Sequence, residues 1–373
     1  MNIIKESAPH LRRKATVARM MGDVLIALAP TLVFSFVVYP VQTAIDLVIS
    51  LAIMIGAEFV YVGLRNMMPK DGQKHAFKEL FEYSYKGKYT INNILSPAIT
   101  AVIFTLIMPA GAPIYAIVVG ALAGIIIGKL VFGGLGSNIF NPAVVGMLFA
   151  KLCFNSQYVT YVDTWYYTIP DVAAGATPLG LVNDGMLSNV TQYPLTDMLL
   201  GRIPGTLGEV YKITILVGLL YLLIRKSADV RIVASYLGSF TIFALIAGLS
   251  IYGLNQNVNP FYFTAYSLLS GGVLFGATFM LTDPVTSPIN SPSRVMYGII
   301  AAIATIFIRL FGAYPEGVGF SILIANMCAV VLDHYEWSSS QYNWKKYLGI
   351  ALLVAIPGLI LFLALYFGGG YRG

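Results

Sequence analysis

Three kinds of residue in this 373-residue sequence have types and spacings suited to chemistry. The first is a hydroxyl, Thr177, which ends the turn-prone stretch Asp171-Val-Ala-Ala-Gly-Ala-Thr. The second is a set of charged residues within or beside long apolar runs, where an ionisable group must be paired or serve a function. The third is a set of prolines that break helices and expose backbone donors and acceptors, which can hold an ion or a polar head.

Four charged residues are candidates for ion passage or for balancing the charge of a bound group. Glu58 lies within an apolar run and Asp283 lies in a Thr-Asp-Pro break, so both are candidates for an ion pathway. Lys129 and Arg309 lie near the ends of apolar runs, where they either snorkel to the interface or balance a negative charge. The remaining acids near apolar runs are expected to cap helices or lie at interfaces: Asp46, Glu316 and Asp333.

The composition shows what kind of protein positions these residues. Hydrophobic residues make up 57% of the chain, charged residues 11%, and the mean hydropathy is +0.76. Such a chain has too little polar surface for a soluble globule, so it must contact a lipid bilayer. The net charge of +6 lies in loops between apolar runs, which indicates membrane topology and not nucleic-acid binding. Cys153 and Cys328 lack partners at ligand spacing, so neither a metal site nor a disulfide is expected.

The apolar runs predict an all-α polytopic membrane protein with ten or eleven transmembrane helices. Each run approaches the roughly 20 residues that cross a bilayer core, and charge, Pro or Gly bounds it. The fifth run is short and opens at Asn141-Pro142, which is consistent with a broken helix. The predicted spans are 21–40, 42–64, 93–109, 113–132, 140–154, 209–225, 231–249, 263–282, 295–312, 317–333 and 347–367.

Lysine and arginine in the short loops predict the orientation of the chain. When the spans are counted alternately, the basic loops 65–92, 225–231 and 345–346 fall on the same side as the N-terminus. That side is expected to be the cytoplasm of a cell inner or plasma membrane. The polar segment 155–208, which is rich in Asp, is then expected on the outer side.

Two stretches of the chain share an order of features. The comparison starts at Leu95-Ser96 in span three and at Leu269-Ser270 in span eight, and it matches Lys129 with Arg309 and Pro109 with Pro284. Apolar helices of similar composition also align by chance, so coincidence is the alternative. Because the two sets are five spans apart, they cross the membrane in opposite directions, as in a 5+5 inverted repeat. The expected organisation is an N-terminal cytoplasmic segment, a first five-helix repeat, an external loop, a second repeat and a C-terminal segment with a possible extra helix: 1–20, 21–154, 155–208, 209–333 and 334–373.

The stretch ending at Thr177 closely resembles the Asp-x-x-Ser-Gly-Ala-Thr pattern to which a flavin transferase esterifies FMN through its phosphate. Asp171, Gly175, Ala176 and Thr177 match the pattern, and Ala174 stands where it usually has Ser or Thr. The chain also resembles one family at three further places: Ser7 to Pro30, Gly136-Ser-Asn-Ile-Phe-Asn-Pro-Ala143 and Thr282-Asp-Pro-Val-Thr286-Ser-Pro288.

That family contains the D subunit of the Rnf complex, an ion-translocating ferredoxin:NAD oxidoreductase, and the B subunit of the sodium-pumping NADH:quinone reductase. The resemblance covers about residues 7–333, and the length and the short N-terminus favour the Rnf subunit. It implies an electron relay that carries covalent FMN on Thr177 and is coupled to Na⁺ or H⁺ movement. The implied partners are other membrane and peripheral subunits, some bearing flavins and iron–sulfur centres.

By the same resemblance a second, non-covalent flavin, either riboflavin or FMN, is expected near Thr282-Asp283-Pro284. The candidate residues for this flavin or for the ion pathway are Asn141, Asp283, Thr286, Glu58, Lys129 and Arg309. The chain has no cysteine set for a cluster and no Gly-rich nucleotide loop after a strand, so nicotinamide and ferredoxin sites are expected on partner subunits.

Without these motifs, inverted repeats and proline-broken helices would indicate a secondary transporter or a small-solute channel. A membrane scaffold for other subunits is the third class, and it predicts neither a cofactor nor an ion flux. All three classes share one fold, so hydropathy does not separate them. A flavin on Thr177 would, because a channel has no use for a tethered chromophore.

Overall fold

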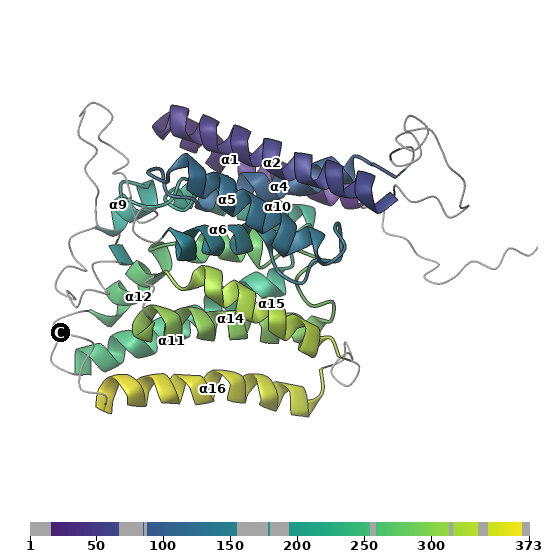
Figure 1. The fold of residues 1–373 in the computed structure, drawn as a ribbon. Coiled ribbons are helices and arrows are strands. Elements are labelled where there is room, and N and C mark those ends of the chain that lie inside the picture. The colour runs from purple at the N-terminus through teal and green to yellow at the C-terminus, as the bar shows by residue number, and fades with distance from the viewer. Residues whose placement is uncertain are drawn as a thin grey trace, which may run out of the picture.

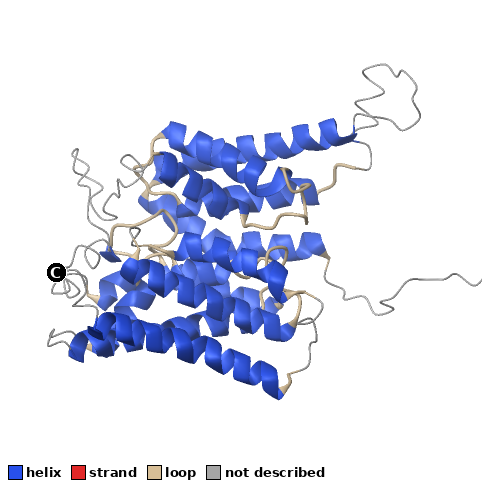
Figure 2. Ribbon diagram, turned by 60° about the horizontal axis from the view of Figure 1, so that its bottom comes forward, coloured by secondary structure: helices blue, strands red, loops and turns tan. Residues whose placement is uncertain are grey.

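The computed structural model describes residues 16–66, 85, 88–154, 178–179, 194–253, 259–312, 316–334 and 342–367. Every regular element within these ranges is a helix (Figure 2). One isolated β-bridge joins Pro109 to Thr206. The stretch from Asp171 to Thr177 lies outside the described residues.

Most helices run side by side in one stack, with α1 at one edge and α16 at the opposite edge (Figure 1). Helices α11 and α14 pack together, and α16 covers both. The elements are α1 Val17–Val38, α2 Pro40–Asn66, α4 Asn92–Ile107, α5 Ile114–Ile125, the π-helix η1 Ile126–Leu130, α6 Pro142–Cys153, α9 Leu195–Leu200, α10 Lys212–Arg225, α11 Val230–Gly253, α12 Pro260–Leu269, α13 Val273–Phe275, the π-helix η3 Gly276–Met280, α14 Ser291–Phe311, α15 Val318–Leu332 and α16 Trp344–Phe367.

The described residues contain five helices that are long and apolar enough to cross a membrane: α1, α2, α11, α14 and α16. A sixth is added if the pair 260–269 and 273–280, bent by 60°, forms one span. Four more apolar helices are shorter, at 92–107, 114–130, 142–153 and 318–332. The protein is therefore all-α and multi-pass in character, whereas the ten or eleven spans and the inverted repeat remain predictions.

The stack has two ends, which we call proximal and distal. The proximal end is where α1 begins, α4 begins and α10 ends, and residues from all three line one cavity there. The distal end is where α1 ends and α2 begins. Helices α9 and α12 lie toward the distal end (Figure 1).

Glycines at four-residue spacing bring α5 and α6 into backbone contact. A Cβ atom on Gly146 would lie 2.5 Å from the carbonyl oxygen of Gly120, and one on Gly124 would lie 2.7 Å from the carbonyl oxygen of Pro142. On Gly128 it would lie 2.9 Å from Pro142 Cα. Only glycine permits this approach, which follows the small-xxx-small rule of membrane helix packing. The contact holds the start of α6 against the segment that carries Lys129.

The helix breaks do not all fall where the sequence placed them. Predicted span 263–282 is interrupted at Ser270-Gly271-Gly272, where Gly271 adopts a left-handed φ of 58°. Asn141-Pro142 begins α6 and does not interrupt it, because Pro at the first helical position loses no hydrogen bond. Both π-helices end a helical segment, η1 after α5 and η3 after α13.

Candidate functional site

A cavity of about 440 Å³ opens among the helix ends at the proximal end. Its walls come from the starts of α1 and α4, the end of α10, η3 and the two turns 135–142 and 282–285. Most of the wall is apolar. The polar groups that face it include Asn92, Lys129, Asn138, Asn141 and Asp283. Three residues predicted from distant parts of the sequence, at 129, 141 and 283, therefore converge on one cavity.

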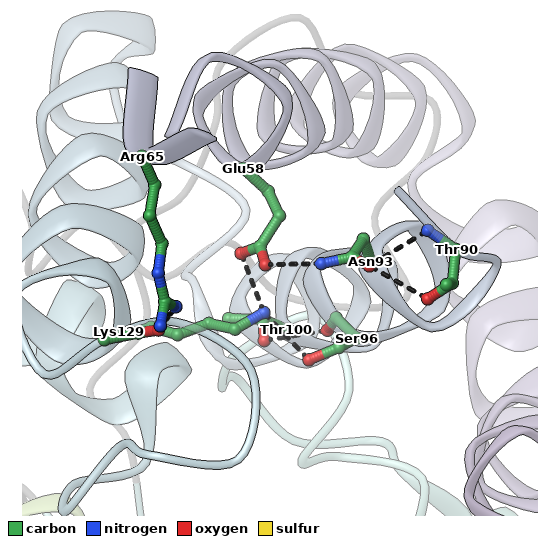
Figure 3. A network of polar contacts seen from close by, with 8 residues as sticks. Glu58, Arg65, Thr90, Asn93, Ser96, Thr100 and Lys129 are labelled. Carbon is green, nitrogen blue, oxygen red and sulfur yellow. Dashed lines mark hydrogen bonds and ion pairs between the residues drawn. The ribbon is translucent and has the colours of Figure 1, made fainter. Parts of the chain in front are cut away.

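Lys129 and Glu58 form a buried ion pair beside this cavity (Figure 3). The ammonium Nζ lies 3.0 Å from Glu58 Oε2, and the two side chains are only 2% and 1% exposed. Lys129 also donates to Ser96 Oγ at 2.9 Å, and Asn93 Nδ2 donates to Glu58 Oε1 at 3.4 Å. Thr90 completes the chain by donating to Asn93 Oδ1. The network joins α2, α4 and η1.

The local fold explains why Lys129 points inward. It lies in the π-helix η1, whose wider turn alters the direction of a side chain relative to an α-helix. Arg65, at the end of α2, donates to the carbonyl of Gly133 at 2.9 Å and holds the turn after η1 against α2. Snorkelling, one of the explanations for Lys129, is wrong, because its side chain is buried and paired.

Asn141 caps α6 and also reaches the other half of the chain. Its Oδ1 accepts from the backbone N–H of Ala143 at 3.1 Å and of Val144 at 3.4 Å. Its Nδ2 donates to the carbonyl of Met280, the last residue of η3, at 3.5 Å. The residue is 4% exposed. Asn141 therefore fixes the two turns of the cavity to each other.

Asp283 organises the second turn. Its carboxylate accepts from the N–H of Val285 at 3.1 Å and from the hydroxyl of Thr286 at 3.4 Å. Burial raises the pKa of Asp283 above its ordinary value, although these two donors and the charge of Lys129 act in the opposite direction. Thr286 is thus a partner of Asp283, and it is itself buried.

Arg309 lies outside the proximal cavity, at the break between α12 and α13. Its guanidinium donates to the carbonyls of Ser267 and Ser270 at 2.8 Å and 3.1 Å and lies over the ring of Phe240. These partners surround the break after α12, toward the distal end. Arg309 and Lys129 therefore lie in separate polar clusters.

The expected flavin attachment residue Thr177 and the other motif residues, Asp171, Gly175 and Ala176, lie outside the described residues, but the two residues after them are described. The carbonyl of Pro178 accepts from Tyr266 Oη at 2.9 Å. A Cβ atom on Gly271 would lie 2.7 Å from Leu179 Cδ1 and 3.0 Å from Arg309 Nη2. The chain just after Thr177 is therefore packed on the break that Arg309 supports.

Sequence reasoning missed several polar residues that the fold brings into these clusters. Asn92, Asn93 and Ser96 lie in the first turns of α4. The sequence places Asn93 and Ser96 in an expected apolar span and Asn92 in the basic loop before it, so none of the three is a predicted site residue. Lys212 begins α10, and Glu209 lies three residues before it. The Lys212 ammonium donates to the carbonyls of Glu209 and Gly271. Polar residues at the first turn of an apolar run were the available signal.

The chain is similar in sequence to known proteins over most of its length. A model of the NQR2, RnfD, RnfE family matches residues 4–340. The D subunit of the Na⁺-translocating ferredoxin:NAD⁺ oxidoreductase complex of Acetobacterium woodii is 29% identical over 335 residues, which cover 90% of this chain and 94% of that protein.

Two B subunits of Na⁺-translocating NADH-quinone reductases are also similar. The Chromohalobacter salexigens protein is 36% identical over 241 residues, 64% of this chain and 57% of that protein. The Ectopseudomonas mendocina protein is 35% identical over 242 residues, 64% of this chain and 58% of that protein. The matched part thus spans less than two thirds of the length of these B subunits.

The buried pair predicts strongly non-additive mutations. Glu58→Gln leaves Lys129 buried without its counter-charge, and Lys129→Met leaves Glu58 in the same position, so each should cost about 3–5 kcal/mol of stability. The double variant should lose much less than the sum of the two. Thermal unfolding of the detergent-solubilised protein measures all three.

Arg202→Met serves as the control, because Arg202 and Asp197 form an exposed pair at 3.9 Å. Its loss should cost at most about 1 kcal/mol. Strictly additive losses at positions 58 and 129 would contradict a coupled buried pair.

Proposed function

Because this chain belongs to the NQR2, RnfD, RnfE family, we propose that it is the membrane subunit of a complex that couples electron transfer to the movement of Na⁺ or H⁺. The observation that carries the proposal is the similarity to the Acetobacterium woodii protein over nearly the full length of both chains. By that likeness the electrons pass between ferredoxin and NAD. The chain acts as a relay among membrane and peripheral subunits that bear flavins and iron–sulfur centres.

Covalent FMN on Thr177 is the first redox group of this proposal. Its support is the motif from Asp171 to Thr177 together with the packing of the next two residues. Pro178 is bonded to Tyr266, and Leu179 lies against Gly271. An FMN on Thr177 would therefore be tethered close to the folded body, with Arg309 near enough to balance negative charge on the flavin.

Thr177→Ala should abolish covalent flavin. The wild-type chain, expressed with a flavin transferase and denatured on a gel, should show flavin fluorescence and the mass of one FMN adduct. The variant should show neither, because it lacks the hydroxyl that forms the phosphoester. Thr196→Ala, a nearby threonine in α9, should keep both. A dark wild-type band with active transferase would return the protein to the transporter class.

A second, non-covalent flavin in the proximal cavity is the other part of the proposal. A volume of about 440 Å³ with mostly apolar walls is in the range of small-molecule sites. Asn92 Oδ1 is buried and has no partner among the described residues, so it is a free acceptor for a ligand N–H. Asn138, Asn141 and Lys129 would supply donors to the carbonyl edge of the ring. When bound, the flavin would supply the electron-accepting ring; the protein orients it and keeps water out.

Filling the cavity should displace this flavin alone. Val24 lines the cavity, whereas Val33 lies on the same helix and is 58% exposed. Val24→Trp should lower the flavin released by acid extraction and leave the covalent fluorescent band unchanged. Val33→Trp should release the wild-type amount. Equal release from both variants would place the second flavin elsewhere or remove it.

We further propose a 5+5 inverted repeat with the N-terminus inside and residue 177 outside. Lys129 lies at the proximal end and Arg309 lies toward the distal end, as equivalent residues of an inverted repeat would. The basic loops after α2 and α10 support the inside assignment of the proximal end.

Glu58 and Asp283 are the proposed residues of the proximal ion path. Asp283→Asn removes a charge that faces the cavity and should reduce cation transport by purified complex in liposomes more than it reduces electron transfer. The comparison requires unchanged flavin content in the variant. Equal coupling ratios in wild type and variant would exclude Asp283 from the path.

A further inference from the structure

Helix α2 buries a polar stripe that runs toward the distal end. At steps of three or four residues the buried side chains are Thr43, Asp46, Ser50, Met54 and Glu58. Glu58 is satisfied by Lys129, and the Thr43 hydroxyl is bonded to Ser35 at 2.9 Å. The middle of the stripe is different, because its polar atoms are only partly satisfied.

Asp46 is completely buried. Its Oδ1 accepts from Gln42 Nε2 at 2.9 Å, and Gln42 also reaches the carbonyl of Ala112 at 3.4 Å. Its Oδ2 has no partner among the described residues. Within the same part of the structure, the hydroxyls of Ser50 and Thr105 are also fully buried and without partners.

The helix register places these three residues within about one helical turn of each other along α2 and α4. Helices α2 and α4 are antiparallel neighbours, with Glu58 bonded to Asn93. Asp46 precedes Glu58 by 12 residues and Thr105 follows Asn93 by 12 residues (58 − 46 and 105 − 93). At 1.5 Å per residue both are displaced by about 18 Å in the same direction. Ser50 lies one turn from Asp46 on the same helix.

Among the described residues, no cation pairs with Asp46. Among described elements, α1, α4, α5 and η1 pack against α2. Their charged side chains are Arg19, Asp23 and Lys129, all toward the proximal end, and the other titratable group is Tyr115, which is 48% exposed. An unpaired buried polar group destabilises the fold, and an ionised buried carboxylate without a counter-charge destabilises it more. Three such oxygens within about one helical turn are therefore suited to bind a cation.

We propose that Asp46 Oδ2, with the hydroxyls of Ser50 and Thr105, forms a binding site for the transported small cation, Na⁺ or H⁺, between α2 and α4. Carboxylate and hydroxyl oxygens suit a hard cation, and a proton on Asp46 would give a donor to either hydroxyl. The site lies about 18 Å along α2 from Glu58, in the distal half of the stack. It rests on the proposed ion translocation and adds a second station to that path.

Asp46→Asn tests the site in the purified complex reconstituted in liposomes. The change keeps the shape of the side chain and removes its charge. Electron-transfer rate, ²²Na⁺ uptake and proton movement are followed while Na⁺ and pH are varied. If Na⁺ is the cation, the Na⁺ concentration for half-maximal rate should rise at least about tenfold, as expected for loss of a charged ligand. If H⁺ is the cation, proton movement per electron should fall while electron transfer continues.

Thr105→Val keeps the test decisive should Asp46→Asn fail to assemble. It removes one proposed ligand and should shift the same quantity in the same direction by a smaller factor. Thr241→Val is its matched control, since the Thr241 hydroxyl donates to the carbonyl of Leu237 in its own helix. Asp197→Asn, which changes a partly exposed acid in α9, controls for the loss of a carboxylate. Both controls should behave like wild type.

Wild-type ion dependence and pumping in assembled Asp46→Asn or Thr105→Val complexes would overturn the site and leave the proposed function intact. A wild-type complex that transfers electrons and moves neither cation would overturn the coupling itself, and the site with it. Flavin content, measured on every preparation, separates both results from loss of the redox groups.

Discussion

The ion pair between Glu58 and Lys129 is the constraint on which the proximal half of the molecule depends. An unpaired charge at this depth is expensive, so the two side chains hold α2 and η1 at a fixed spacing. Ser96 and Asn93 satisfy the remaining positions and bring α4 into the same arrangement. The cavity beside the pair takes its shape from these fixed helix ends.

Close backbone packing makes this arrangement possible. The glycines of α5 and α6 allow the start of α6 to lie against η1, which places Asn141 beside Lys129 at the cavity. Asn141 in turn reaches Met280 in the other half of the chain. A single small cavity is thereby built from turns about 140 residues apart, and neither half encloses it alone.

The buried polar groups form three separate clusters along the stack. The cavity gathers Lys129 and Asp283 at the proximal end, and Arg309 supports the break on which Leu179 packs toward the distal end. Asp46 is buried on α2, and its Oδ2 has no partner among the described residues. In the proposed function these are the places of the non-covalent flavin, the tethered flavin and a transported cation. Electron transfer through each flavin and binding of the cation would then take place in different polar clusters.

The sequence by itself determined the class of the protein, because the composition and the length of the apolar runs decide whether helices are stable in a bilayer. It also identified Asn141, Asp283 and Lys129 as candidates, from proline breaks and from charge in apolar surroundings. Only the tertiary structure decided their partners. Three features depend on which helices pack together: the pairing of Glu58 with Lys129, the break at Gly271 and the Asp46 oxygen without a partner among the described residues. The sequence does not show which helices are neighbours, because the apolar runs have similar compositions.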